Sequence, residues 1–139
     1  MFVLGVPLLI FPFAIYNILV FLMPTFSWTN ELWHFRMMSG GEWGITPGDI
    51  MIAGSIVILL IEMLKAARMS RRTFVDHLLS MILFIGMLVE FLMVKEVAST
   101  TFFLLLVISF VDVTGGFAVS LRAAQRDISV EGVENVHGN

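Results

Sequence analysis

The chain has 139 residues, of which 58% are hydrophobic and only 14% charged, and its mean hydropathy is +0.95. A soluble domain carries about a quarter charged residues, so this composition indicates a membrane protein with no room for a separate soluble catalytic domain. The net charge of −3 argues against a nucleic-acid partner, and the absence of cysteine excludes disulfides, thiolate metal sites and a cysteine nucleophile.

The first 23 residues form an uncharged apolar run that ends before Pro24. The run is long enough to cross a bilayer and lacks the basic start and small-residue cleavage site of a secretory signal. Residues 2–23 are therefore predicted to form a retained transmembrane helix. Pro7 and Pro12 each remove a backbone donor, so this helix is expected to be kinked or to begin irregularly near Pro7.

Residues 24–49 contain all three tryptophans and two glycine-containing turns. Between Thr29 and Met38, apolar and polar residues alternate irregularly, which predicts a short amphipathic helix at the level of the lipid headgroups. Because tryptophan is enriched at membrane interfaces, we expect this segment to anchor the loop on the membrane surface. The alternative is a lid over a ligand site. The anchoring residues would be Trp28, Trp33 and Trp43.

Three further apolar runs follow, and each is long enough to cross the membrane as a helix. The turn at residues 46–48 precedes the first of them, and Asp49 is placed to cap its N-terminus. The predicted spans are residues 50–67, 73–94 and 100–121.

The predicted spans make residues 1–122 one transmembrane domain. The remaining residues, 123–139, form a polar tail with a weak apolar pattern. We expect this tail to be disordered in the cytoplasm, with docking on a partner as the alternative.

Basic residues are concentrated on one side of the predicted membrane. Six of the eight lysines and arginines lie at the end of the second span, between the second and third spans, or after the fourth, and only Arg36 and Lys95 lie on the other side. The positive-inside rule therefore predicts four crossings with both termini in the cytoplasm and the tryptophan-rich loop outside. The basic loop is also expected to attract anionic lipid headgroups through Lys65, Arg68, Arg71 and Arg72.

Four acidic residues lie inside the predicted spans, where one charge costs about 2.5 to 3.5 kcal/mol on insertion scales. They are Glu62, Asp76, Glu90 and Asp112. Their predicted heights rise in steps across the membrane, with Glu62 and Asp76 near the cytoplasmic boundary and Asp112 deeper. A series of buried carboxylates on three helices is one way to build a proton or cation relay.

Three of these acids also have simple structural explanations. Lys65 follows Glu62 by three residues and Arg72 precedes Asp76 by four, which are the usual pairing distances on a helix. Asn17 of the first span is expected at the height of Glu90, so an interhelical hydrogen bond would satisfy that carboxyl group.

Asp112 has no basic neighbour in its own helix. It belongs to a stripe of small and polar residues spaced i, i+3, i+7 and i+11, which predicts a helix-packing face. That face consists of Ser109, Asp112, Gly116 and Ser120. Two interpretations stay open: a protonated Asp112 that hydrogen-bonds to a neighbouring helix, and a functional Asp112 that exchanges protons.

Cofactor and catalytic signatures are missing from the sequence. The histidines lie in the outer loop, at a helix end and in the tail, so no pair can hold a buried haem or pigment. The sequence also lacks a phosphate-binding loop, a zinc-protease motif and a serine-hydrolase motif. We therefore expect no metal, no cofactor and no enzymatic activity.

The predicted fold is an all-α integral membrane protein: a four-helix transmembrane bundle with an interfacial amphipathic segment between spans one and two. The leading functional hypothesis is a non-catalytic accessory or assembly subunit that packs against other transmembrane helices, in a hetero-complex or a homo-oligomer. The alternative is an oligomeric proton- or cation-conducting channel or transporter that uses the intramembrane carboxylates. The charge bias favours a bacterial inner membrane.

Overall fold

The computed structural model describes residues 6–68 and 73–137. In this part of the chain, three helices are long and apolar enough to cross a membrane, and a fourth, apolar one is shorter. The elements are α1 (Ile10–Leu22), β1 (Trp33–Arg36), β2 (Glu42–Ile45), α2 (Pro47–Arg68), α3 (Thr73–Met93), the 3₁₀ helix η2 (Lys95–Val97) and α4 (Thr100–His137).

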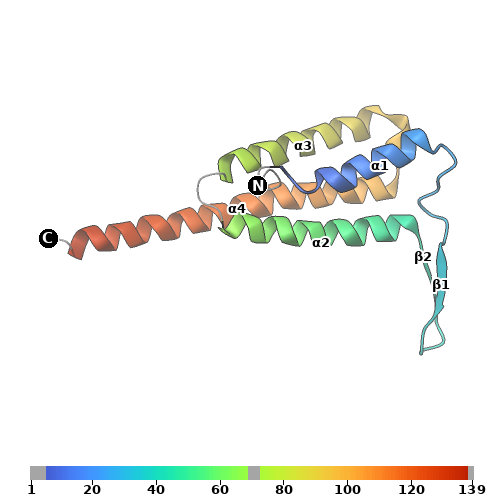
Figure 1. The fold of residues 1–139 in the computed structure, drawn as a ribbon, viewed down its shortest axis with the longest axis horizontal. Coiled ribbons are helices and arrows are strands. Elements are labelled where there is room, and N and C mark those ends of the chain that lie inside the picture. Colours follow the sequence, from blue (N-terminus) through green and yellow to red (C-terminus); the bar gives the residue numbers. More distant parts are fainter. Residues whose placement is uncertain (1–5, 69–72, 138–139) are drawn as a thin grey trace.

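Helix α4 is the central element of the bundle and packs against both α2 and α3. Helices α1 and α3 run toward the β-hairpin, whereas α2 and α4 begin beside it and run away (Figure 1). We call the side where α2 and α4 begin the hairpin end, and the side where α2 ends and α3 begins the opposite end. The hairpin points away from the bundle, across the direction of the helices, and the C-terminal part of α4 extends beyond its neighbours.

Helix α1 is shorter than the predicted span 2–23, because it begins only at Ile10 and contains 13 residues. Its start is irregular, as expected from Pro7: the Ile10 N–H donates to the Pro7 carbonyl and the Phe11 N–H to the Leu8 carbonyl, in i to i+3 turns. Pro12 lies in the first helical turn, where a missing N–H removes no intrahelical bond. The two prolines therefore set where α1 begins without kinking its interior.

The prediction of a short interfacial helix between Thr29 and Met38 is wrong, because the segment forms an antiparallel β-hairpin. Its register pairs Phe35 with Trp43 and Trp33 with Ile45. A large apolar residue stands at every second position in both strands, which is a strand pattern rather than a helix pattern. Gly40 adopts a φ of 86° in the connecting turn, a conformation that glycine takes without strain.

Helix α2 begins three residues earlier than predicted, and its cap is Thr46 rather than Asp49. The Asp49 N–H donates to Thr46 Oγ1 at 3.2 Å, and the Thr46 N–H donates to Asp49 Oδ2 at 3.0 Å. This reciprocal pair is a capping box with Pro47 at the first helical position. The acidic residue closes the box instead of acting as the N-cap.

The third and fourth predicted spans correspond to α3 and to the first part of α4. Ser99 caps α4, since its Oγ accepts the Phe102 N–H at 3.1 Å. The expectation of a disordered tail is wrong for the backbone, because α4 continues without a break to His137. Residues 121–126 are good helix formers and no proline follows them, so the sequence favours continuation of the helix beyond residue 121.

An aromatic cluster forms the core at the hairpin end. Tyr16 is fully buried and stacks on Trp28 with ring centroids 4.6 Å apart. Phe102 packs against Tyr16 on one side and against Phe13 and Phe91 on others. These contacts join α1, the loop before the hairpin, α3 and α4. The aromatic cluster is defined as Phe13, Tyr16, Trp28, Phe91 and Phe102.

Candidate functional site

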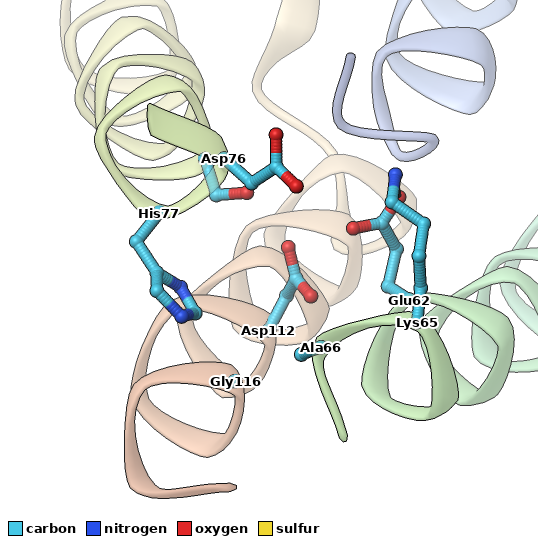
Figure 2. Close-up of a pocket in the computed structure, with 8 residues that line it drawn as sticks. Glu62, Lys65, Ala66, Asp76, His77, Asp112 and Gly116 are labelled. Carbon is cyan, nitrogen blue, oxygen red and sulfur yellow. Dashed lines mark ion pairs between the residues drawn. The ribbon is translucent and has the colours of Figure 1, made fainter. Parts of the chain in front are cut away.

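A pocket at the opposite end of the bundle collects polar side chains from α2, α3 and α4 (Figure 2). Its cavity is about 20 Å³, which is room for one water molecule. We call it the polar pocket, and its lining residues are Glu62, Lys65, Ala66, Asp76, His77, Ser80, Asp112 and Gly116. Three of the four predicted relay acids therefore share one site.

Glu62 and Lys65 form an ion pair across one turn of α2, as predicted, with 3.5 Å between Lys65 Nζ and Glu62 Oε1. Both side chains are largely buried, at 8% and 12% exposure respectively. The pair also binds the segment before α1: the Leu8 N–H donates to Glu62 Oε1 at 2.6 Å, and Lys65 Nζ donates to the Val6 carbonyl at 3.3 Å. A carboxylate at this position satisfies an N–H near the start of α1 and favours its helix dipole.

Asp112 enters the polar pocket from α4 and is 5% exposed. Ser80 of α3 hydrogen-bonds to its carboxyl group, and Lys65 attracts it while Glu62 repels it. Asp112 has no basic neighbour within α4, so its nearby cation is Lys65 of α2. Ser80 follows Asp76 by four residues on the same face of α3, a spacing that could have identified it as part of the site.

Asp76 and His77 complete the pocket on the α3 side. Oxygen Oδ1 of Asp76 is buried and has no hydrogen-bond partner in the described part of the chain. Its predicted partner, Arg72, lies outside the described residues. The ring of His77 lies against Phe117 and against Gly116, where an added Cβ would come within 3.0 Å of the imidazole. Glycine at this position lets α3 and α4 approach closely.

Glu90 lies apart from the other three acids. As predicted, Asn17 of α1 reaches it, with 3.4 Å between Asn17 Nδ2 and Glu90 Oε2. Along α4 from Asp112 toward the hairpin end, the buried side chains become apolar at Ile108, Leu105 and Phe102. The predicted series of four acids is thus divided into a group of three and a single residue, with an apolar core between them.

The predicted packing face of α4 is turned inward. Ser109, Asp112 and Gly116 are buried, and α4 packs there against α2 and α3 of the same chain. The side chain of Ser120 lies outside the described residues. Neighbouring Gly115 has a similar role, since a Cβ there would overlap the end of Met63 of α2.

The remaining predicted site residues fall into separate environments. Trp28 belongs to the aromatic cluster, whereas Trp33 and Trp43 are 62% and 49% exposed on the hairpin. Lys65 faces the polar pocket instead of an open loop. The Arg68 side chain and all of Arg71 and Arg72 lie outside the described residues.

Among the described residues, no group of three or more histidine, aspartate and glutamate side chains is arranged to hold a metal ion. Comparison with protein-family models, curated proteins and solved structures finds no match to this chain.

Proposed function

We propose that this chain is a non-catalytic membrane subunit that binds transmembrane helices of another chain through the outward face of α3. The observation that carries this proposal is Gly86, in the middle of α3. Gly86 is exposed, and a Cβ built on it would meet nothing within 4 Å. Glycine in a helix interior costs about 1 kcal/mol relative to alanine, and no contact within the described chain uses its small size.

The other mid-membrane glycines differ from Gly86. The space beside Gly115 and Gly116 of α4 is filled by Met63 and His77 of the same chain. Gly54 of α2 is exposed and, like Gly86, would meet nothing within 4 Å with an added Cβ, but it lines a groove that α1 of the same chain also lines. In membranes, small residues lie where two helix backbones approach closely. Gly86 lies between exposed Ile82 and Val89, so a second helix can fit into the gap between them.

The polar pocket supports the same function. Its ion pair binds the segment before α1, and the Ser80 hydrogen bond connects α3 to α4. Beyond Ser109 toward the hairpin end, the buried side chains Ile108, Leu106 and Leu105 of α4 are apolar. Polar groups that fasten helices together suit a subunit that acts by binding.

A second candidate function is proton or cation conduction by an oligomer, and the unpartnered buried oxygen of Asp76 favours it. A carboxyl oxygen without a partner in a water-sized cavity can take up a proton. Asp112→Asn keeps a hydrogen-bonding side chain but cannot exchange protons. Flux into proteoliposomes that Asp112→Asn abolishes would support conduction, and unchanged flux would reject it.

The proposed topology has four crossings with both termini in the cytoplasm, in a bacterial inner membrane. Helix α1 covers only about 20 Å at about 1.5 Å per residue, and Leu8 contacts Glu62 two turns before the end of α2. Helix α1 by itself therefore falls short of a full crossing, so length supports the first crossing least and this crossing is the one to test. Because the chain has no cysteine, single-cysteine variants test it directly. A membrane-impermeant thiol reagent added to intact cells should label Ser39→Cys but not Gln125→Cys.

The binding function is tested by isolating the protein from its native membrane in mild detergent and measuring the mass of what copurifies. We expect a stoichiometric complex. Gly86→Leu should release the partner, because a large side chain fills the gap in α3. Val57→Phe, which also adds bulk on an exposed face but on α2, should retain it. A chain that purifies alone, or a complex that survives Gly86→Leu, would contradict the proposal.

A further inference from the structure

We propose that the space beneath the β-hairpin binds one zwitterionic phospholipid with an ammonium headgroup, taken from the leaflet at the hairpin end. The site is an open-sided pocket of about 590 Å³ between the hairpin and the first turns of α2 and α4. It lies at the other end of the bundle from the polar pocket and on other helices than Gly86, so it is independent of the proposed partner interface.

The pocket changes from polar to apolar along the helix direction. Thr46 and Asp49 at the start of α2, with Thr100 and Thr101 at the start of α4, line its polar part. Ile56 and Leu104 line its apolar part, and Ile56 lies about 10 Å beyond Asp49 along the axis. Both are exposed on the flank of the bundle, at 52% and 39%. This order matches a lipid with its headgroup at the helix ends and an acyl chain along the flank.

The hairpin covers this pocket with its apolar face. Because side chains alternate along a strand and Phe35 pairs with Trp43, the residues Trp33, Phe35, Trp43 and Ile45 share one face, and Trp43 and Ile45 line the pocket. Glu31 and Glu42 each contact the imidazole of His34, at 2.7 Å and 3.7 Å, away from that face. Since the hairpin lies across the helix direction (Figure 1), its apolar face lies against lipid when the helices span a membrane.

Charge selects the headgroup. Asp49 uses Oδ2 for the Thr46 N–H, which leaves its second oxygen available to an ammonium group. Ser99 already accepts the N–H groups of Phe102 and Phe103, so the donors left for a phosphate at the start of α4 are the N–H groups and hydroxyls of Thr100 and Thr101. None of the described residues that line the pocket is lysine or arginine. An anionic lipid would meet the Asp49 carboxylate without a compensating cation, so the zwitterionic lipid is favoured.

Native mass spectrometry of the full chain, released from detergent containing equal amounts of phosphatidylethanolamine and phosphatidylglycerol, tests the proposal. We expect one phosphatidylethanolamine retained per chain. Trp43→Ala should lower the bound fraction about tenfold, the equivalent of about 1.4 kcal/mol. Trp33→Ala is the matched control, because Trp33 shares the apolar face but does not line the pocket. Circular dichroism confirms that both variants are folded.

The headgroup assignment has its own test. Asp49→Asn keeps an oxygen for the Thr46 N–H but removes the charge, so phosphatidylglycerol should then bind as well as phosphatidylethanolamine. Equal retention of both lipids by the unchanged chain would overturn the assignment. Equal loss of lipid from Trp43→Ala and Trp33→Ala, or a second protein chain in place of lipid, would overturn the site itself.

Discussion

The two ends of the bundle fasten α4 to its neighbours by different means. At the hairpin end, the aromatic cluster packs Tyr16 and Phe102 without exposure to solvent, and Tyr16 bonds to Ser99, the cap of α4. At the opposite end, in the polar pocket, Asp112 of α4 bonds to Ser80 of α3 and is attracted by Lys65 of α2. Lipid is as apolar as a leucine side chain, so helices in a membrane associate through close packing or through hydrogen bonds. In this chain, aromatic packing dominates at the hairpin end, and buried polar contacts are concentrated at the opposite end.

This difference determines what each end tolerates. Close packing depends on volume, so the aromatic cluster should be damaged by a smaller side chain even when polarity is unchanged. A buried polar group depends on its partner, so the polar pocket should be damaged by an unpaired charge even when volume is kept. Substitutions at each end separate these two sensitivities through changes in stability measured in detergent or nanodiscs.

The largest effect is expected for Tyr16→Ala in the aromatic cluster. This change removes a fully buried ring that contacts Trp28 and Phe102, and it should lower the free energy of unfolding by about 4 kcal/mol. Tyr16→Phe removes only the bond to Ser99 and should cost about 1 kcal/mol. Thermal unfolding measures both. Similar losses for the two variants would mean that the hydroxyl pair, rather than ring packing, holds this end together.

The next largest effect is expected for Lys65→Met, which keeps the length of the side chain but removes its charge. Glu62 then lies buried without its cation, and the start of α1 loses the donor to the Val6 carbonyl. Removing one partner of a buried ion pair should cost about 3 kcal/mol. Chemical unfolding followed by tryptophan fluorescence reports the change.

A second substitution at Glu62 distinguishes charge from packing in this pair. If the unpaired carboxylate causes the loss, Glu62→Gln with Lys65→Met should be more stable than Lys65→Met alone, because the amide is neutral and still accepts the Leu8 N–H. A double variant that is less stable than the single one would contradict a charge-balance role for the polar pocket.

Local patterns predicted much of this structure from the sequence. The residue spacing of Glu62 and Lys65 identified their ion pair, and the equal depth of Asn17 and Glu90 identified their hydrogen bond. The bounds of α3 followed from hydropathy to within one residue of the prediction. Each of these depends on neighbours along one helix or on the length of a span, which the sequence contains directly.

Contacts between side chains of different helices could not be predicted in the same way. Estimated depth placed Asp112 well above Glu62 and Asp76, yet the three line one pocket. That depth was counted from a predicted end of the fourth span at residue 121, whereas α4 continues to His137. The packing face of α4 was recognised, but its occupants in the structure are α2 and α3 of the same chain. The hairpin was not predicted because each strand has only four residues. A two-residue period over so short a segment was interpreted as an irregular helical pattern.

A smaller effect is expected at the cap of α2, Thr46, which directly follows the second strand of the hairpin. Thr46→Ala removes the hydroxyl that accepts the Asp49 N–H and should cost about 1 kcal/mol. Thr46→Ser keeps the hydroxyl and should leave stability nearly unchanged. Hydrogen exchange of the first turn of α2 should increase in the alanine variant alone. Equal exchange in both variants would show that the hairpin, and not the capping box, holds the start of α2.

The smallest effect is expected for Asp76→Asn, and it tests whether all acids of the polar pocket contribute alike. Asp76 Oδ1 has no partner in the described part of the chain, whereas Asp112 is bound by Ser80. An amide at position 76 removes one negative charge near Glu62 and Asp112 and supplies a donor. Stability should therefore change by less than about 1 kcal/mol, toward a more stable protein. Asp112→Leu, which removes the acceptor for Ser80, should destabilise it in the same unfolding assay. A large loss of stability from Asp76→Asn would mean that this carboxylate is as firmly paired as Glu62. Every acid in the polar pocket would then depend on its charge partner, in contrast to the residues of the aromatic cluster.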